Sequence, residues 1–130
     1  MDDAKITIKR WLQKADNDLK TAIIMNKEKD PPTDVVCFHC QQCAEKCLKA
    51  YLVSVEHDFP KTHDLEHLIS LCVIHDKTFK EIEEHAIAIT DYAVETRYVD
   101  EWREISQEES IRAIDRAQKI KDFVAAKKIL

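Results

Sequence analysis

The chain has 130 residues, no glycine and three prolines, and its formal net charge is -5. Strand proteins need glycine in tight turns, so this composition predicts an all-α fold, with residues 1–130 as a single domain. The acidic balance disfavours a general nucleic-acid binder, and no apolar run approaches the length of a membrane-spanning helix, so we expect no membrane association. Five cysteines, an odd count, and an N-terminus without a secretory signal indicate reduced thiols in the cytoplasm.

Two helices are predicted in the first half of the chain. The first covers residues 4–27, where apolar residues recur at helical spacing, and the two prolines that follow end it. The second begins at Thr33 or Asp34, either of which can cap a helix, and runs to about Val55.

Three further helices are predicted after it. Thr62 is the expected N-cap of the third helix, and Asp64 suits its positive end. After a break at residues 75–77, Thr78 and Glu81 form a capping box for the fourth. The fifth helix opens on a second capping box, formed by Ser106 with Glu109. Its predicted buried stripe consists of Ile111, Ile114, Ala117, Ile120 and Val124. Five amphipathic helices joined by short loops predict an up-and-down helical bundle.

Four cysteines crowd into the second helix with the spacing C-x2-C-x2-C-x3-C, at Cys37, Cys40, Cys43 and Cys47. Iron–sulfur proteins use this spacing, but a continuous helix cannot wrap four ligands round a cluster. On a helix, three of the four share the apolar face with Cys43 at its edge, so we interpret them as small core residues. The alternative is a zinc site of His39, Cys43 and Cys47, with Cys72 from another helix. We expect no metal and no cofactor.

The two sides of the second helix do not divide cleanly into apolar and polar. Gln41 projects near the centre of the apolar face, so its buried amide is expected to bond a neighbouring element. The opposite side is predicted to carry Gln42, Glu45, Lys46 and Lys49. Three apolar residues also point away from the core face, at Val35, Phe38 and Val53. Apolar groups on both sides predict that this helix is covered twice, either by its own chain or by a second subunit.

Four segments of the chain resemble the HEPN domain family. FHCQQCAEKCLKAYL resembles the second-helix signature of that family, with cysteine where alanine is usual. WLQKADNDLKTA resembles the first helix, PKTHDLEHL the P-x-T-H-D-L segment, and TRYVD the R-Y-P-D segment, with Val99 in place of proline. The segments keep the family order and span most of the chain.

The resemblance implies a compact α-helical up-and-down bundle that is commonly a homodimer. Many HEPN proteins work beside a minimal nucleotidyltransferase, often as a toxin–antitoxin pair, and others are linked to nucleotide binding. Some members are ribonucleases with an R-x(4–6)-H motif. That motif is absent here, because no histidine follows His85 and because the required places after Arg10 hold Ala15, Asp16 and Asn17. We therefore predict no catalytic residue and lean towards a protein that is not an enzyme.

The candidate ligand-binding residues are Arg97, Tyr98, Asp100, His63, Asp64 and Lys46. The first three lie near a further arginine and tryptophan, and such a set suits a phosphate and a stacked base, although a plain interhelix connection explains it as well. His63 beside Asp64 suits proton transfer, but helix capping accounts for the same residues. Lys46 shares the polar side of the second helix with His39, where a solvated surface is the alternative.

The sequence thus predicts a non-catalytic interaction module. We expect a homodimer that partners a nucleotidyltransferase, as in toxin–antitoxin pairs, or that contacts a nucleotide or RNA. One alternative is a ribonuclease toxin with a non-standard site. The other is a metal or redox protein built on the cysteine run.

Overall fold

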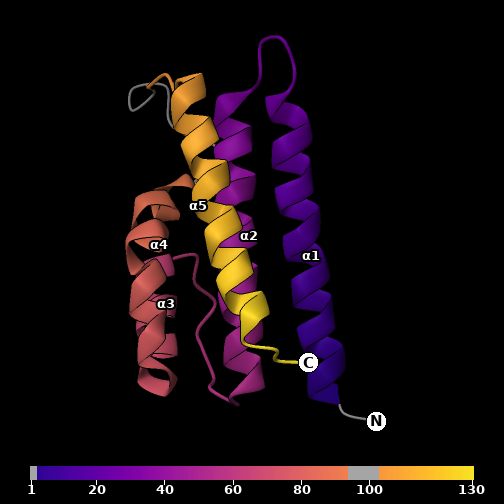
Figure 1. The fold of residues 1–130 in the computed structure, drawn as a ribbon, viewed down its shortest axis with the longest axis vertical. Helices are drawn as coiled ribbons and strands as arrows, with labels where there is room; N and C mark the ends of the chain where they lie inside the picture. The colour runs from indigo at the N-terminus through magenta and orange to yellow at the C-terminus, as the bar shows by residue number, and fades with distance from the viewer. Residues whose placement is uncertain (1–2, 94–102) are drawn as a thin grey trace.

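The protein is described by a computed structural model over residues 3–93 and 103–130. Within these ranges there is no strand, and the elements in chain order are α1 (Asp3–Asn26), α2 (Thr33–Ser54), α3 (Leu65–His75), the 3-10 helix η1 (Lys77–Ile82), α4 (Glu83–Ile89), the 3-10 helix η2 (Thr90–Ala93) and α5 (Gln107–Ala126). This architecture confirms the predicted all-α bundle (Figure 1).

The helices are stacked side by side along one long axis. α1 and α2 form an antiparallel hairpin, after which residues 55–64 run back along the bundle, so that α2 and α3 point in the same direction (Figure 1). α4 then returns antiparallel to α3, and α5 packs against both α2 and α4. Among the described helices, none combines the length and the apolar composition that crossing a membrane requires.

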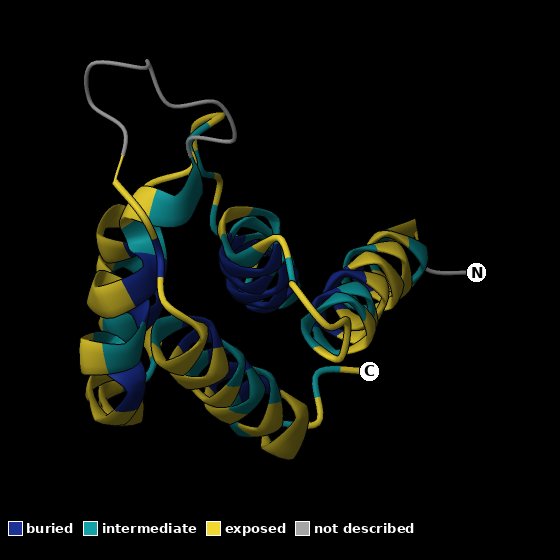
Figure 2. Cartoon of the chain, turned by 90° about the horizontal axis from the view of Figure 1, so that it is seen from above, coloured by how far each residue is buried: buried dark blue, intermediate teal, exposed yellow. Residues whose placement is uncertain are grey.

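α2 is the central element of the bundle. It packs against α1, α3, α4, η2 and α5, and its ribbon is dark blue over much of its surface when the molecule is seen from above (Figure 2). The largest fully buried side chains around it include Phe79, Leu48, Leu52, Leu65, Leu68 and Ile120. A helix with neighbours on several sides is buried all round, which explains why its sequence has no simple amphipathic pattern.

Several helix starts differ by one or two residues from those predicted. α2 has Pro32 at its N-cap position, with no side-chain cap. The Thr33 hydroxyl instead donates a hydrogen bond to the carbonyl oxygen of Ile105, at 2.6 Å. Neither Thr33 nor Asp34 therefore caps α2, because the proline fixes the backbone at the cap and Thr33 is already helical.

Aspartate takes the cap that threonine was expected to fill at two other starts. The Asp64 carboxylate accepts hydrogen bonds from the first backbone N–H groups of α3, while the Thr62 hydroxyl only accepts one from the Asp64 N–H. Asp76 likewise caps η1 through the Thr78 N–H, so the predicted fourth helix starts as a 3-10 turn. At α5 the predicted Ser106 cap is confirmed, since its hydroxyl accepts a hydrogen bond from the Glu109 N–H. The capping box is only half formed, because the Glu109 carboxylate bonds Arg103 and Tyr92.

One member of the predicted α5 stripe is misplaced. Ile111 is 57% exposed, although Ala117, Ile120 and Val124 are buried as expected and Ile114 is partly buried against the core. Its position on the helix lies on the side that faces away from both α2 and α1. The sequence pattern was broad enough to include Ile111, but contact with α2 requires only a narrower stripe.

All five cysteines are buried free thiols, including Cys43, which was expected at the edge of the core. Burial raises the pKa of the Cys37 and Cys72 thiols to about 12 and raises the pKa of Cys40 further. In the described ranges, no three or more His, Cys, Asp or Glu side chains are grouped so that they could hold a metal ion. The metal or redox alternative therefore gains no support from the geometry of the cysteine run.

We predict that the native protein reacts very slowly with Ellman's reagent at pH 8. The thiolate is the reactive form, and both burial and raised pKa values keep it scarce. All five thiols should react at once after unfolding in urea, which serves as the control. A thiol that reacts rapidly without denaturant would show that part of the cysteine run is open to solvent.

Candidate functional site

The residues that the sequence marks as unusual gather on one side of α2. We call this side the outer face of α2 and define it by six residues that share one side of the helix and are all partly buried, namely Val35, Phe38, His39, Gln42, Lys46 and Val53. Two buried carboxylates flank this face, Asp18 from α1 and Glu45 from α2 itself. Each carboxylate holds one histidine and one lysine.

Asp18 forms the first of these groups. Its Oδ1 accepts a hydrogen bond from Nδ1 of His39 at 2.8 Å, and its Oδ2 accepts one from the ammonium group of Lys46. Because α1 and α2 are antiparallel neighbours, the aspartate of one helix bonds two residues that lie two helical turns apart on the other. The pair of contacts ties the two helices together at mid-height.

Glu45 forms the second group. Its Oε1 accepts a hydrogen bond from Nδ1 of His63 at 2.8 Å, and its Oε2 accepts one from Nζ of Lys49 at 3.0 Å. The side chains of Glu45 and Lys49 are only 4% and 8% exposed, so this ion pair is essentially removed from water. The Lys49 ammonium also lies over the rings of Trp11 and Phe59, at 5.6 and 5.8 Å from their centroids.

Two glutamines complete the network round Glu45. Gln41 is fully buried and donates from Nε2 to the backbone carbonyl oxygen of His63 at 2.8 Å, which confirms the predicted tie between this amide and a neighbouring segment. Gln42 donates to Oε1 of Gln41 at 2.7 Å. Each buried polar side chain in the described part of the chain therefore has a hydrogen-bond partner.

The two histidines have the same local geometry but different access to solvent. Each uses Nδ1 to bond a carboxylate, and within the described residues Nε2 makes no hydrogen bond in either ring. The His63 side chain is 68% exposed, whereas that of His39 is 25% exposed. A histidine held in this way has a fixed ring orientation and an outward nitrogen, which suits proton transfer or recognition of a polar group.

Apolar residues lie at both ends of the outer face of α2. Val35, Phe38 and Val53 are partly buried, and none of them is among the apolar residues that pack on the core in the described ranges. Phe38 makes an edge contact with the His39 ring, at a centroid distance of 5.5 Å. The face thus has apolar ends and a charged, internally paired middle.

The structure brings some of the predicted site residues together and separates others. Lys46 and His63 both lie at the outer face of α2, on opposite sides of it, through their bonds to Asp18 and Glu45. Asp64 is the N-cap of α3, so the carboxylate paired with His63 is Glu45 and not its sequence neighbour. Three other predicted site residues lie outside the described residues, namely Arg97, Tyr98 and Asp100.

Sequence reasoning misplaced the polar side of α2. Glu45 and Lys49 were expected to face solvent, and both are buried. The reason is that α1 and the returning segment 55–64 cover this side, and helical periodicity carries no information about a second layer of cover. A signal was nevertheless present, since Gln41 and Glu45 are spaced to share a turn and a buried amide requires polar neighbours.

Comparison with known proteins agrees with this architecture. A family model described as the HEPN domain matches residues 8–129. A solved crystal structure of an archaeal HEPN homologue is similar with a TM-score of 0.74 at 22% sequence identity, covering 92% of this chain and 96% of that chain. At this identity the likeness shows the fold alone. No functionally curated protein matches the chain.

We predict that Glu45→Gln lowers the free energy of unfolding by about 3–5 kcal/mol, because it leaves the buried Lys49 ammonium without its counter-ion. Asp115→Asn is the matched control. It breaks the exposed pair between Asp115 and Lys119, whose side chains are 61% and 54% exposed, and should change stability by less than about 0.5 kcal/mol. Urea unfolding followed by circular dichroism measures both. Equal effects would mean that Glu45 is not buried as described.

Proposed function

We propose that this chain, which belongs to the HEPN domain family, is a non-catalytic interaction module in which the outer face of α2 pairs two copies of the protein. The observation that carries this proposal is the set of three partly exposed apolar residues that the described part of the chain does not pack on its core, namely Val35, Phe38 and Val53. Apolar side chains left half covered along one helix are typical of a surface that a second molecule completes.

The charge on this face supports a partner identical to the chain itself. Asp18 is paired with Lys46 and Glu45 with Lys49, so the ionised groups of the face sum to zero. The chain as a whole carries a formal charge of -5, so most other surfaces of two copies would repel one another. A neutral face on an acidic protein is where self-association meets the least electrostatic cost.

The layout of the face is also suited to two-fold symmetry. Its apolar residues lie near both ends of α2, and its polar residues lie in the middle. In a two-fold pair each residue contacts a different residue of the same surface on the partner. An antiparallel arrangement of two α2 helices would therefore bring Phe38 of one copy beside Val53 of the other, with Gln42 and Lys46 near the axis.

We further propose that this dimer partners a minimal nucleotidyltransferase or binds a nucleotide, as the family resemblance implies. Support comes from the four sequence segments that match the family in order and from the absence of the R-x(4–6)-H motif, which removes the expected catalytic role. The buried, reduced thiols are consistent with work in the cytoplasm. Co-purification from the native host, with identification of bound protein and nucleotide, tests this part.

One observation favours a second candidate, a ribonuclease with a non-standard site. His39 and His63 are each held by a carboxylate, with the outward Nε2 unbonded in the described residues, and Lys46 lies nearby. Two histidines can supply a general base and a general acid, and an ammonium group can stabilise a phosphorane-like charge. Against this reading, Lys46 is already paired with Asp18, which reduces its ability to bind a second anion.

We predict that the protein is a dimer at micromolar concentration and that Phe38→Glu dissociates it without loss of helical circular dichroism. In the antiparallel pairing each new carboxylate would lie unpaired against the apolar Val53 of the other copy, in an interface that should bury more than about 1,000 Å² in total. Light scattering gives the mass. Ile111→Glu on α5 is the control, because Ile111 is also exposed and apolar but lies outside the proposed face.

Three results would contradict the pairing role. A monomer mass for the unaltered protein removes the dimer itself. Dissociation by Ile111→Glu with no effect of Phe38→Glu would move the interface to α5. Unfolding of the Phe38→Glu variant would show that Phe38 belongs to the chain's own core, since an unpaired buried carboxylate is costly.

We also predict that the purified protein does not cleave single-stranded RNA. The reason is the missing family motif together with the full engagement of Asp18, Glu45, Lys46 and Lys49 in internal pairs. A fluorescent RNA oligomer with gel readout measures this. Cleavage that disappears in His63→Asn, while Asp115→Asn retains it, would instead establish the second candidate.

A further inference from the structure

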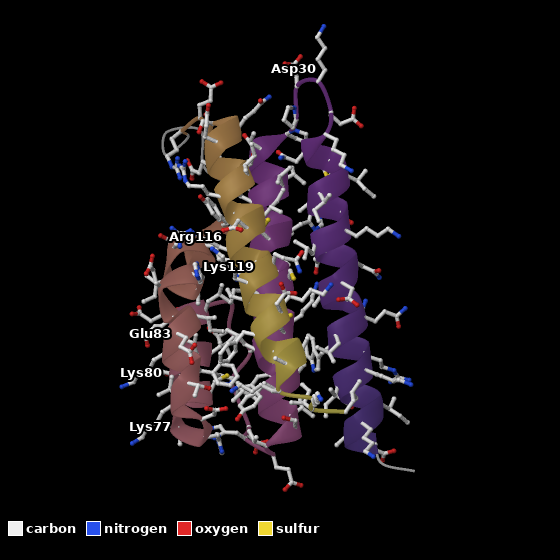
Figure 3. All side chains as sticks on the ribbon, in the orientation of Figure 1. Asp30, Lys77, Lys80, Glu83, Arg116 and Lys119 are labelled. Carbon is white, nitrogen blue, oxygen red and sulfur yellow. The ribbon has the colours of Figure 1, made fainter. Side chains whose placement is uncertain are left out.

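A small cavity opens between α4, η2 and α5, on a different part of the molecule from the outer face of α2. Its volume is about 190 Å³, and its apolar floor is formed by Ile89 with two alanines. The polar side chains at its mouth are Tyr92, Glu109, Arg112 and Arg116. Figure 3 shows Arg116 and Lys119 on the stretch of α5 that passes α4. The ability of this cavity to hold an anion depends on which of these charges other residues of the chain already neutralise.

Glu109 is fully engaged. Arg103 donates to its two carboxylate oxygens at 2.9 and 2.7 Å, and the Tyr92 hydroxyl donates to Oε2. The Arg103 hydrogen bonds are the main reason that the pKa of Glu109 falls to about 2. Glu109 is the only carboxylate among the described residues that line the cavity, and Arg103 carries most of its compensation, with a smaller Coulombic contribution from Arg112.

Arg116 is oriented but not neutralised. Its Nη1 donates to Nδ1 of His85 at 3.1 Å, an uncharged acceptor when the ring is neutral. Burial, followed by repulsion from Arg116 and Lys119, lowers the pKa of His85, which keeps the ring in that form at neutral pH. The nearest carboxylate is that of Glu84, at 3.9 Å, and its side chain is 85% exposed. Such a distant, solvated contact contributes little.

Arg112 makes no hydrogen bond and no ion pair to any residue within 3–93 and 103–130. It lies one helical turn before Arg116, so both guanidinium groups are presented on one side of α5 at the same cavity. Arg116 bonds a neutral imidazole and reaches the exposed Glu84 only at 3.9 Å, and Arg112 acts on Glu109 only through a weaker Coulombic attraction, so positive charge stays available at this cavity.

We propose that Arg112 and Arg116 bind a phosphate group at the mouth of this cavity. The phosphate would be either inorganic phosphate or the terminal phosphate of a mononucleotide. A phosphate group has enough terminal oxygens to accept from two guanidinium forks at once. The cavity is smaller than the roughly 300 Å³ at which pockets begin to enclose drug-sized ligands, so it admits the phosphate and leaves a nucleoside outside.

This proposal goes beyond the pairing role and does not depend on it, while its nucleotide alternative rests on the nucleotide binding proposed above. The half-buried ring of Tyr92 lies at the cavity mouth, and its hydroxyl is occupied by Glu109, so only the ring remains for contact with a ligand. Stacking on an aromatic ring would favour a nucleotide over free phosphate. Comparison of the two ligands therefore identifies the source of the phosphate.

The test is a titration of the isotope-labelled protein with sodium phosphate, adenosine 5′-monophosphate and adenosine at constant ionic strength. We expect saturable shifts of the Nε–Hε resonances of Arg112 and Arg116 with both phosphate-bearing probes at millimolar concentration, and none with adenosine. Arg112→Gln and Arg116→Gln should each weaken binding by roughly tenfold or more, because each removes charge-assisted hydrogen bonds. Tighter binding of the nucleotide assigns it as the source, and equal binding assigns free phosphate.

Arg10→Gln is the matched control, because it removes the same charge from an exposed position on α1. Its binding should equal that of the unaltered protein. An equal loss in Arg10→Gln would overturn the proposal, since it would reflect only the net charge. Absence of saturable shifts with both phosphate probes, or equal shifts with adenosine, would also overturn it. Phe38→Glu should bind phosphate normally, so failure of the pairing role and failure of this site are distinguishable.

Discussion

The structure depends on the burial of α2 between helices on nearly every side. A helix in that position must place polar groups somewhere inside the bundle, and this chain concentrates them on two carboxylates, Asp18 and Glu45. Each accepts from one histidine and one lysine through different oxygens. A buried carboxylate alone would be strongly destabilising, but with two cationic or donor partners its desolvation is offset. The packing of α1, α2 and residues 55–64 is therefore fixed by polar geometry as well as by apolar contact.

Such networks add little net stability compared with a well-packed apolar core of the same shape. These polar networks instead determine which arrangement of the helices is the most stable one. Asp18 can reach both His39 and Lys46 only at one register of α1 against α2, and Glu45 can reach His63 only if the returning segment lies along the bundle. The cysteines and alanines of α2 have no comparable selectivity, because small apolar side chains pack acceptably in several registers. The small residues thus permit several registers of α1 against α2, and the polar pairs select one of them.

Each structural feature could be predicted from the sequence only where the interacting residues lie close together along the chain. Local signals were sufficient for the five helices and for the Ser106 cap, because capping and periodicity involve residues one turn apart. The same signals predicted Thr62 as the cap of α3, where the structure has Asp64. Both residue types are good caps, and only the path of the chain decides which of them lies at the helix start. Burial of Glu45 and Lys49, exposure of Ile111 and the contact between His85 and Arg116 all depend on elements distant in sequence. Periodicity within one helix cannot supply that information.

The same reasoning separates the two surfaces to which roles are assigned. On the outer face of α2 every ionised group has an internal partner, so the surface is neutral and suits contact with another protein surface. In the groove between α4 and α5 the carboxylate is compensated by Arg103, while Arg116 bonds a neutral imidazole. Positive charge therefore stays available there and nowhere on the α2 face. In the roles proposed above, the acids of the chain neutralise the α2 face, where association would be favoured, while Arg112 and Arg116 are only weakly compensated at the other surface, where an anion would bind.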